Sequence, residues 1–266
     1  MKGAYYIAAS YDMLYSPDFV SKVVETLEKP ENKKYGSATC KLMRWEFSEK
    51  NLNLEKSKSN CIDSVGLGLT KGHYFFDHGQ GQEDQGQFDQ LKEVFGTSGA
   101  LGIFKKEALA DIAYKNKDHT EFFDELIHYK NDIDLAYRLQ WAGWPCLFIS
   151  NAKVWHDRQA ESEGKNKSML LNILKSRKDK ANWVKENSFF GHLVVLAKNY
   201  RNRGFSLKVR IKTNLMNFFK LCYICVFERL LFQQYKKLKE RSTEITNKRN
   251  AMLIRQKPSE LESLMI

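Results

Sequence analysis

The chain has 266 residues, of which 42% are hydrophobic, so it can form one large domain with a buried core, or one domain plus an extension. Its five cysteines lack the spacing of a disulfide framework, which excludes a small disulfide-stabilised fold and favours a reducing compartment. The net charge of +11 is concentrated in residues 157–266, which hold 24 Lys and Arg against 10 Asp and Glu. This excess favours contact with an anionic surface, membrane or nucleic acid, although a solvated basic helix explains the charge equally well.

In chain order, the first part of the sequence alternates between short apolar stretches and amphipathic or polar ones. Residues 4–10 predict a buried strand, and residues 35–45 predict a second one. Between them, residues 17–28 have the spacing of an amphipathic helix with Ser16 as its N-cap. Its expected buried face consists of Phe19, Val23, Val24 and Leu27. Residues 72–90 are rich in Gly, Gln and acidic residues and predict a long loop, which is often a functional feature.

The middle of the chain continues this alternation. Residues 94–109 predict a turn, a short strand and the start of a helix, and residues 131–142 predict a further helix. Residues 145–156 predict a strand that ends in a histidine. Strands and helices that alternate in this way favour a layered α/β domain.

The helix predicted from Asn131 carries charged side chains in its first turns. Asn131 suits the N-cap position, with Asp134 as the matching third residue of a capping box. Asp134 also precedes Arg138 by four residues, the spacing of a helical ion pair, which gives it a structural explanation. Asp132 lies on a nearly opposite face, in the first turn, where the helix dipole favours an ionised carboxylate. It is therefore either an ordinary acid at a helix start or a general base.

The last part of the chain, residues 168–266, is predicted to be helical and basic. Its most apolar stretch, residues 215–232, is interrupted by three charged residues and is marginal for a membrane-spanning helix. An amphipathic helix that lies in an anionic membrane surface fits these features better, and a helix packed on the domain is the alternative. No nucleic-acid-binding motif accompanies the charge, so we expect no nucleic-acid partner. The final residues 258–266 are expected to be loosely held.

Two stretches, FGTSGALGIFKKEAL and FFDELIHYKNDIDLAYRLQWAGWPCLFISNAKVWH, together resemble the acceptor half of glycosyltransferase family 2. The shared features are a Ser-Gly-Ala turn before a strand, an Asp-x-Asp-Leu-x-x-Arg helix, a Gly-Trp pair and a strand ending in Val-x-His. The likeness extends over about residues 1–200 and is nearest to bacterial rhamnosyltransferase-like members.

The sequence departs from the family pattern at two motifs and at its start. Asn131 stands where the family usually has Glu, and Ser10-Tyr11 stand where it has Asn-Pro. The family's first strand and nucleotide-base pocket have no counterpart, so we expect a truncated or split catalytic domain. As it stands, such a chain is expected to bind nucleotide sugars weakly.

The resemblance implies a partial glycosyltransferase A-type fold with a mixed sheet in residues 1–167, followed by a basic, amphipathic helical extension in residues 168–266. It implies an inverting enzyme that transfers a sugar from a dTDP- or UDP-sugar to a hydroxyl of a lipid-linked or glycan acceptor, in bacterial cell-surface polysaccharide synthesis. We expect such an enzyme in the cytoplasm, peripheral on the inner face of the cell membrane. The alternative is a non-catalytic fragment or partner subunit of a split transferase.

The same resemblance implies roles for individual residues. Asp132 matches the family's catalytic base. Asp12 and His156 match residues that hold a divalent cation, Mg²⁺ or Mn²⁺, at the diphosphate of the donor. Ser98 and Gly99 match the turn of the acceptor site. The remaining residues expected on the substrate side are Asn131, Asp134, Arg138 and Trp144. Of these, Arg138 and Trp144 are expected to act as structural supports of the site.

Overall fold

The computed structural model describes residues 3–46, 53–116, 118–157, 181–200 and 203–266. Within these residues, one sheet consists of β1 (Tyr5–Ala9), β2 (Met13–Tyr15), β3 (Ser37–Trp45), β4 (Lys58–Ser64), β7 (Glu93–Val94), β8 (Leu101–Lys105) and β11 (Cys146–His156). Its order is β1-β8-β3-β11-β2, with β4 paired to β3 and β7 paired to β11. Strands β3 and β11 are parallel and the other pairs are antiparallel, so the sheet is mixed, as the sequence predicts.

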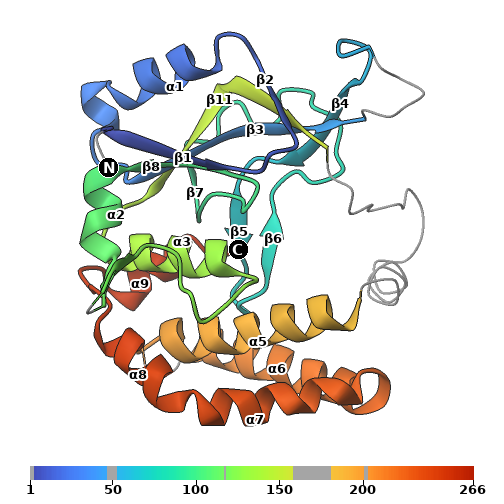
Figure 1. Cartoon of the computed structure of the whole chain (residues 1–266), viewed down its shortest axis with the longest axis vertical. Helices are drawn as coiled ribbons and strands as arrows, with labels where there is room; N and C mark the ends of the chain where they lie inside the picture. The colour runs from blue at the N-terminus through green and yellow to red at the C-terminus, as the bar shows by residue number, and fades with distance from the viewer. Residues whose placement is uncertain (1–2, 47–52, 117, 158–180, 201–202) are drawn as a thin grey trace.

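Helices cover both faces of this sheet. They are α1 (Phe19–Leu27), α2 (Lys106–Ile112), α3 (Asn131–Trp141), α5 (Asn182–Asn199), α6 (Leu207–Phe227), α7 (Phe232–Glu240), α8 (Ser242–Asn250) and α9 (Pro258–Ser263), with 3-10 turns η1 (Pro30–Asn32) and η2 (Arg229–Leu231). In Figure 1, α1 lies on one side of the sheet and α3 on the other, and α5 to α8 form a further layer beyond α3. Two short pairs lie outside the sheet: β5 (Leu67–Leu69) with β6 (Phe75–Asp77), and β9 (Tyr114–Lys115) with β10 (Thr120–Glu121). This layering confirms the predicted α/β class.

Helix α1 packs against the sheet and begins later than the sequence predicts. Its N-cap is Asp18, so the prediction of Ser16 as the N-cap is wrong. The Phe19 amide instead donates to the Ser16 carbonyl oxygen, which closes a turn before the helix. The buried side chains of the helix are Phe19, Val23 and Leu27. Val24 remains exposed because it lies farther round the helix than Phe19, Val23 and Leu27, at the edge of the buried face.

Strand β11 is long, and its pairing with β3 is interrupted once. Ile149 pairs with Cys40 and Lys153 pairs with Lys41, so residues 150–152 form a bulge on β11. Beyond this bulge, β11 also pairs with β2, and this pairing continues to the last residue of β11, His156. The bulge therefore sets which side chains of the end of β11 face each side of the sheet.

One large hydrophobic cluster joins α3 to the C-terminal helices. Tyr137 and Trp141 of α3 contact this cluster together with Phe190 of α5 and Val209 of α6. The helical layer is thus part of the same core as the rest of the described chain. The predicted boundary between residues 167 and 168 lies outside the described residues.

The end of the chain is held in place, contrary to the expectation of a loose terminus. Leu261 of α9 and Met265 are buried in the large hydrophobic cluster. The Ile266 amide donates to the Leu69 carbonyl oxygen at 3.0 Å, and the Lys71 amide donates to the Ile266 carbonyl oxygen at 3.0 Å. Composition alone suggested mobility, but two apolar side chains and these backbone bonds fix the segment beside β5.

Candidate functional site

Helix α3 presents Asp132, the candidate base, in its first turn. Lys130 precedes the helix in a left-handed conformation, with φ of 68°. Asn131 is therefore the first helical residue, and its Oδ1 accepts a hydrogen bond of 3.0 Å from the Asp132 amide. The predicted capping box of Asn131 with Asp134 is wrong, because the helix starts one residue earlier than that motif requires.

The carboxylate of Asp132 lies against the turn made by Ser98, Gly99 and Ala100. A Cβ atom on Gly99 would lie 3.0 Å from Asp132 Oδ2, so a larger residue there would crowd the carboxylate. The Ala100 amide donates a hydrogen bond of 3.4 Å to Ser98 Oγ, which shapes the turn. The candidate base and the predicted acceptor-site turn are therefore in contact.

Burial raises the pKa of the Asp132 carboxyl above its ordinary value. The Ile133 amide and the charge of Lys130 lower this pKa, and the charge of Asp77 raises it further. The net direction is opposite to the effect expected from the helix start, because desolvation outweighs the first-turn amides. A carboxylate with a raised pKa is a stronger proton acceptor, which suits a general base.

Asp12 and His156, the predicted metal-binding pair, lie side by side at the end of β11. The antiparallel ladder of β11 and β2 brings them together, because His156 pairs with Met13. The Asp157 amide also donates to the Asp12 carbonyl oxygen at 3.0 Å. His156 Nε2 lies 3.6 Å from Asp12 Oδ2. On its other side, His156 Nδ1 donates a hydrogen bond of 2.8 Å to Oδ2 of Asp63, a buried residue of β4.

This arrangement fits a divalent cation. The 3.6 Å separation of His156 Nε2 and Asp12 Oδ2 is too long for a hydrogen bond. It is also shorter than two metal–ligand bonds of about 2.1 Å laid end to end. Asp63 orients His156 as carboxylates orient metal-binding histidines, with Nε2 toward Asp12. Asp12 Oδ1 is buried and has no hydrogen-bond partner in the described part of the chain, so it can accept a ligand.

A cation at this position would need further ligands. The described ranges contain no group of three or more His, Cys, Asp or Glu side chains placed to hold a metal. Water and the oxygens of a diphosphate are ligands that Mg²⁺ readily takes in such sites. The pair of Asp12 and His156 is therefore a partial site that a phosphorylated ligand could complete.

A path of contacts connects this pair to the candidate base. The Ser10 amide, two residues before Asp12, donates to the Ala100 carbonyl oxygen at 2.9 Å. Ala100 belongs to the turn whose Gly99 abuts the Asp132 carboxylate. The turn at residues 98–100 therefore contacts both the candidate base and the segment that leads to Asp12.

A second path runs through aspartates that the sequence analysis missed. Asp63, which orients His156, is followed in β4 by Ser64, whose Oγ donates to Asp77 Oδ1 at 2.8 Å. Asp77 is close enough to raise the pKa of Asp132. The signal in the sequence was weak, since it amounts to one aspartate within the apolar stretch IDSVGLGL and one at the end of a short strand.

Asp134 and Arg138, both predicted on the substrate side, lie in a buried charge network. Arg138 Nε lies 2.9 Å from Asp134 Oδ2, which confirms the ion pair predicted from their spacing. Lys198 of α5 lies 2.7 Å from Asp134 Oδ1. Asp134 is 0% and Arg138 2% exposed, so direct contact with a substrate would require this network to open.

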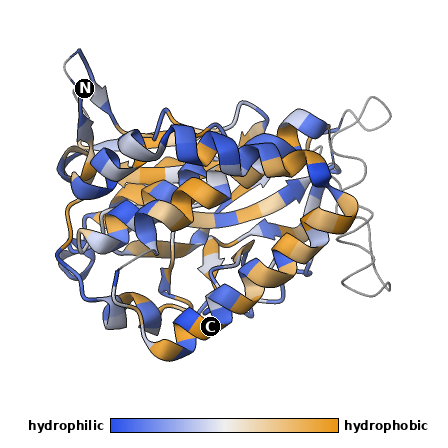
Figure 2. Ribbon diagram, turned by 90° about the horizontal axis from the view of Figure 1, so that it is seen from below, coloured by the Kyte–Doolittle hydropathy of each residue, from blue (hydrophilic) through white to orange (hydrophobic). Residues whose placement is uncertain are grey.

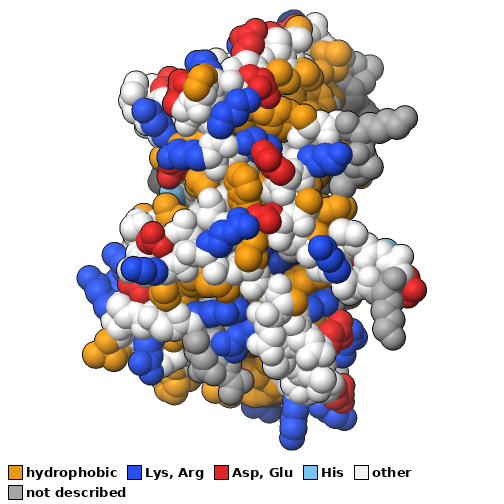
Figure 3. Space-filling view, turned by 90° about the vertical axis from the view of Figure 1, so that its left-hand side faces the viewer, with side chains coloured by type: hydrophobic (Ala, Val, Ile, Leu, Met, Phe, Trp, Pro, Cys, Tyr) orange, Lys and Arg blue, Asp and Glu red, His pale blue; other side chains and the backbone are white. Residues whose placement is uncertain are grey.

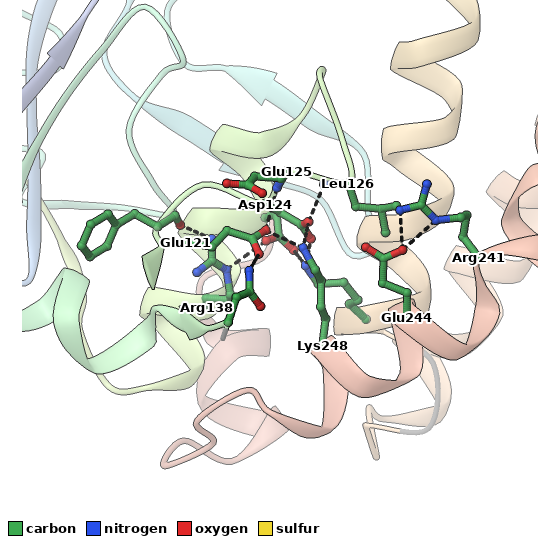
Figure 4. A network of polar contacts seen from close by, with 12 residues as sticks. Glu121, Asp124, Glu125, Leu126, Arg138, Arg241, Glu244 and Lys248 are labelled. Atoms are coloured by element: carbon green, nitrogen blue, oxygen red, sulfur yellow. Dashed lines mark hydrogen bonds and ion pairs between the residues drawn. The ribbon is translucent and has the colours of Figure 1, made fainter. Parts of the chain in front are cut away.

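The network continues from α3 to the outer helices, as Figure 4 shows. Lys198 also pairs with Asp124, and Lys248 of α8 lies 2.6 Å from Asp124 and pairs with Glu121. Each buried carboxylate in this group contacts at least one cation, and each cation contacts at least one carboxylate. The network therefore connects the helix that carries the candidate base to two C-terminal helices.

Trp144 lies just after the end of α3, while Asp132 is in its first turn. Its Nε1 donates a hydrogen bond of 2.9 Å to Asp111 Oδ2. A Cβ atom on Gly36 would lie 2.5 Å from the Trp144 Cβ, so the two segments are tightly packed. The structure thus places Trp144 in the support of α3 and does not bring it to the candidate base.

No protein-family model matches this chain, and no curated protein matches it. Among solved structures, it is similar to a crystal structure of GalNAc-T7 with UDP, GalNAc and Mn²⁺, at 11% identity and a TM-score of 0.40. The match covers 80% of this chain and 38% of that one, so this chain spans well under half of the length of GalNAc-T7. At this level of similarity the likeness identifies neither a family nor an activity.

Proposed function

We propose that the chain carries the catalytic base and the cation ligands of an inverting glycosyltransferase. One arrangement carries the proposal: the Asp132 carboxylate abuts the turn at residues 98–100, and Ser10, two residues before the Asp12 that faces His156, is hydrogen-bonded to Ala100 of that turn. A transferase of this kind needs a proton acceptor beside a site for a divalent cation. This arrangement therefore supports the roles that the motif resemblance implies for Asp12, Asp132 and His156.

In this proposal, Asp132 accepts the proton of an acceptor hydroxyl as the hydroxyl oxygen attacks the anomeric carbon of the donor. The bond from this carbon to the diphosphate oxygen breaks as the new carbon–oxygen bond forms, so the configuration inverts. The electron pair of the broken bond leaves with the nucleoside diphosphate. A carboxylate with a raised pKa suits the first of these roles.

The candidate site is rich in acidic side chains, which explains why a diphosphate would need a cation there. Asp12, Asp63, Asp77 and Asp132 all lie in it, and such a group of carboxylates repels a diphosphate. A bound Mg²⁺ or Mn²⁺ supplies the charge that neutralises the leaving diphosphate. Asp12 and His156 would hold it, and Asp63 keeps His156 in the required orientation.

Titration of the chain with Mn²⁺, followed by electron paramagnetic resonance, tests the cation site. We expect Asp12→Asn to weaken Mn²⁺ binding by about tenfold or more, because it removes one of two protein ligands. Asp18→Asn, a neighbouring change at an exposed helix start, is the matched control and should bind Mn²⁺ as the unchanged chain does. Equal Mn²⁺ affinity in all three proteins would remove Asp12 from the proposed site.

Release of nucleoside diphosphate from a panel of dTDP- and UDP-sugars tests the base. Asp132→Asn should lower turnover by about a hundredfold or more with the fold retained, because it removes general base catalysis. Turnover close to that of the unchanged chain would exclude Asp132 as the base. If Mn²⁺ binds at Asp12 but no donor is turned over by the unchanged chain, the non-catalytic partner of a split transferase is the better description.

The finer assignments belong to the same proposal and rest on the motif resemblance. They are a rhamnosyltransferase-like activity, a lipid-linked or glycan acceptor, a role in bacterial cell-surface polysaccharide synthesis and a place on the cytoplasmic face of the membrane. The donor panel addresses the first of these directly. A preference for a UDP-sugar over dTDP-rhamnose would replace the rhamnosyl assignment without affecting the roles of Asp132 and Asp12.

A further inference from the structure

Helix α6 has an exposed apolar face along its whole length. The large hydrophobic side chains of this face, each between 50% and 68% exposed, are Leu207, Ile211, Leu215, Phe218, Phe219 and Val226. Most are spaced by three or four residues, so they follow one side of the helix. The lower end of the molecule in Figure 3, where α6 and α7 lie in Figure 1, shows hydrophobic side chains at the surface beside Lys and Arg.

The opposite face of α6 holds the helix on the protein. Its buried residues are Val209, Thr213 and Ile224. Thr213 Oγ1 lies 2.9 Å from the buried His73 Nδ1, which ties α6 to the chain near β5. The exposed apolar face is therefore directed away from the core. Figure 2 looks onto this helical side from below and shows hydrophobic and hydrophilic residues alternating along its helices.

The positive charges on α6 favour an anionic partner. The helix carries Lys208, Arg210, Lys212 and Lys220 and no acidic residue between Leu207 and Phe227. Lys208, Arg210 and Lys212 are exposed next to the apolar face. A second copy docked face to face would bring these like charges together. An anionic surface would pair with them while the apolar side chains leave water.

We propose that the outward face of α6 binds in the plane of a membrane that contains anionic lipids. The described helices include none long and apolar enough to cross a bilayer, so α6 would lie in the interface. Its apolar side chains would enter the acyl region while Lys208 and Lys212 contact the headgroups. The inference stands on α6 alone and does not depend on the proposed transferase activity.

Co-sedimentation of the full chain with vesicles tests this surface. The chain should bind vesicles of phosphatidylcholine with 30% phosphatidylglycerol and bind pure phosphatidylcholine vesicles much more weakly. Val226→Glu should reduce affinity for the anionic vesicles about tenfold or more. The variant loses an apolar side chain that would enter the acyl region and gains a negative charge that the anionic lipids repel. Val20→Glu on α1 is the matched control, since Val20 is 61% and Val226 65% exposed.

A charge variant separates lipid binding from apolar adhesion. Lys208→Gln with Lys212→Gln should reduce binding to the anionic vesicles by about thirtyfold and leave binding to neutral vesicles unchanged. Circular dichroism confirms that each variant is folded, and Phe218→Glu replaces Val226→Glu if that variant unfolds. Absence of binding to anionic vesicles, or equal binding by Val226→Glu and the unchanged chain, overturns the proposal. Sedimentation velocity that shows a dimer lost in Val226→Glu, without vesicle binding, overturns it in favour of a second copy.

Discussion

At the scale of single residues, the candidate site combines side chains that the sequence suggested with ones it did not. Asp12, Asp132 and His156 could be named from their motifs, and the ladder of β11 with β2 explains why two of them meet. Asp63 and Asp77 could not be named, because their roles depend on contacts to His156 and Ser64. Sequence spacing shows neither contact, since strands far apart in the chain provide them.

Asp132 offers a prediction on stability as well as on activity. Its pKa is raised by burial, so the folded state favours the protonated form. The associated stabilisation is present below the pKa of the unfolded chain, about 3.9, and is lost as pH rises through the higher folded pKa. At pH 7 the buried carboxylate therefore costs stability. Asp132→Asn should make the protein more resistant to urea at pH 7 than the unchanged chain, with a difference that shrinks toward pH 4.

Urea unfolding curves at the two pH values check this expectation. A variant less stable than the unchanged chain at pH 7 would contradict it and would give Asp132 a structural role. Such an outcome would also weaken the case for the base, because functional residues are often the ones held at a cost to stability.

At the scale of elements, strands and helices with clear periodicity were predicted well, and short or contact-dependent ones were not. The strands that became β1, β3, β8 and β11 and the helices that became α2 and α3 appear where expected. The strands β5 and β6 have three residues each, too few for a hydrophobic periodicity to predict them. They are stabilised by pairing with each other. The loop predicted at residues 72–90 contains β6 and is otherwise irregular, as expected.

An aspartate of this loop with a buried side chain, Asp84, contacts two strands of the sheet. Asp84 lies 2.8 Å from Lys41 of β3 and 2.9 Å from Lys153 of β11. Burial raises the pKa of Asp84, but its bonds to Lys41 and Lys153 outweigh this and lower the value to about 2. The resulting stabilisation is present above the unfolded pKa of about 3.9 and is lost as pH falls through about 2.

Asp84→Asn should therefore lower the free energy of unfolding at pH 7 by about 3 kcal/mol, because it leaves the buried Lys41 without its buried partner. The loss should diminish as the pH approaches 2. Asp89→Asn is the matched control, since Asp89 contacts the same lysine from a half-exposed position and should cost at most about 1 kcal/mol. Equal losses for the two variants in chemical denaturation would show that Asp84 stabilises the fold no more than Asp89.

At the scale of the whole molecule, the basic C-terminal helices are part of the fold that holds the site. Charge and composition predicted a helical extension but could not show that Lys198 and Lys248 reach Asp124, 74 and 124 residues away. Pairings over such distances depend on the tertiary arrangement. The helix that carries Asp132 therefore takes its position in part from α5 and α8.

Lys198→Met tests this dependence. It removes the cation shared by Asp124 and Asp134 and leaves two fully buried carboxylates with one partner fewer. We expect the free energy of unfolding to fall by about 3–5 kcal/mol in denaturant titrations at pH 7. Lys236→Met, on a side chain that is 82% exposed, should change it by less than about 0.5 kcal/mol. A small effect of Lys198→Met would mean that the network contributes little to stability.

The bulge at residues 150–152 has a consequence for how the chain tolerates changes in length. Three residues of β11 intervene between its pairings with Cys40 and Lys41, which are neighbours on β3. Losing one of these three would shorten the bulge and leave the pairing of Lys153 with Lys41 in place. Because side chains alternate along a strand, losing one residue between Lys153 and His156 would instead turn His156 to the other face, away from Asp12, although neither residue had changed. Single-residue deletions in β11 should therefore be tolerated better within the bulge than beyond it.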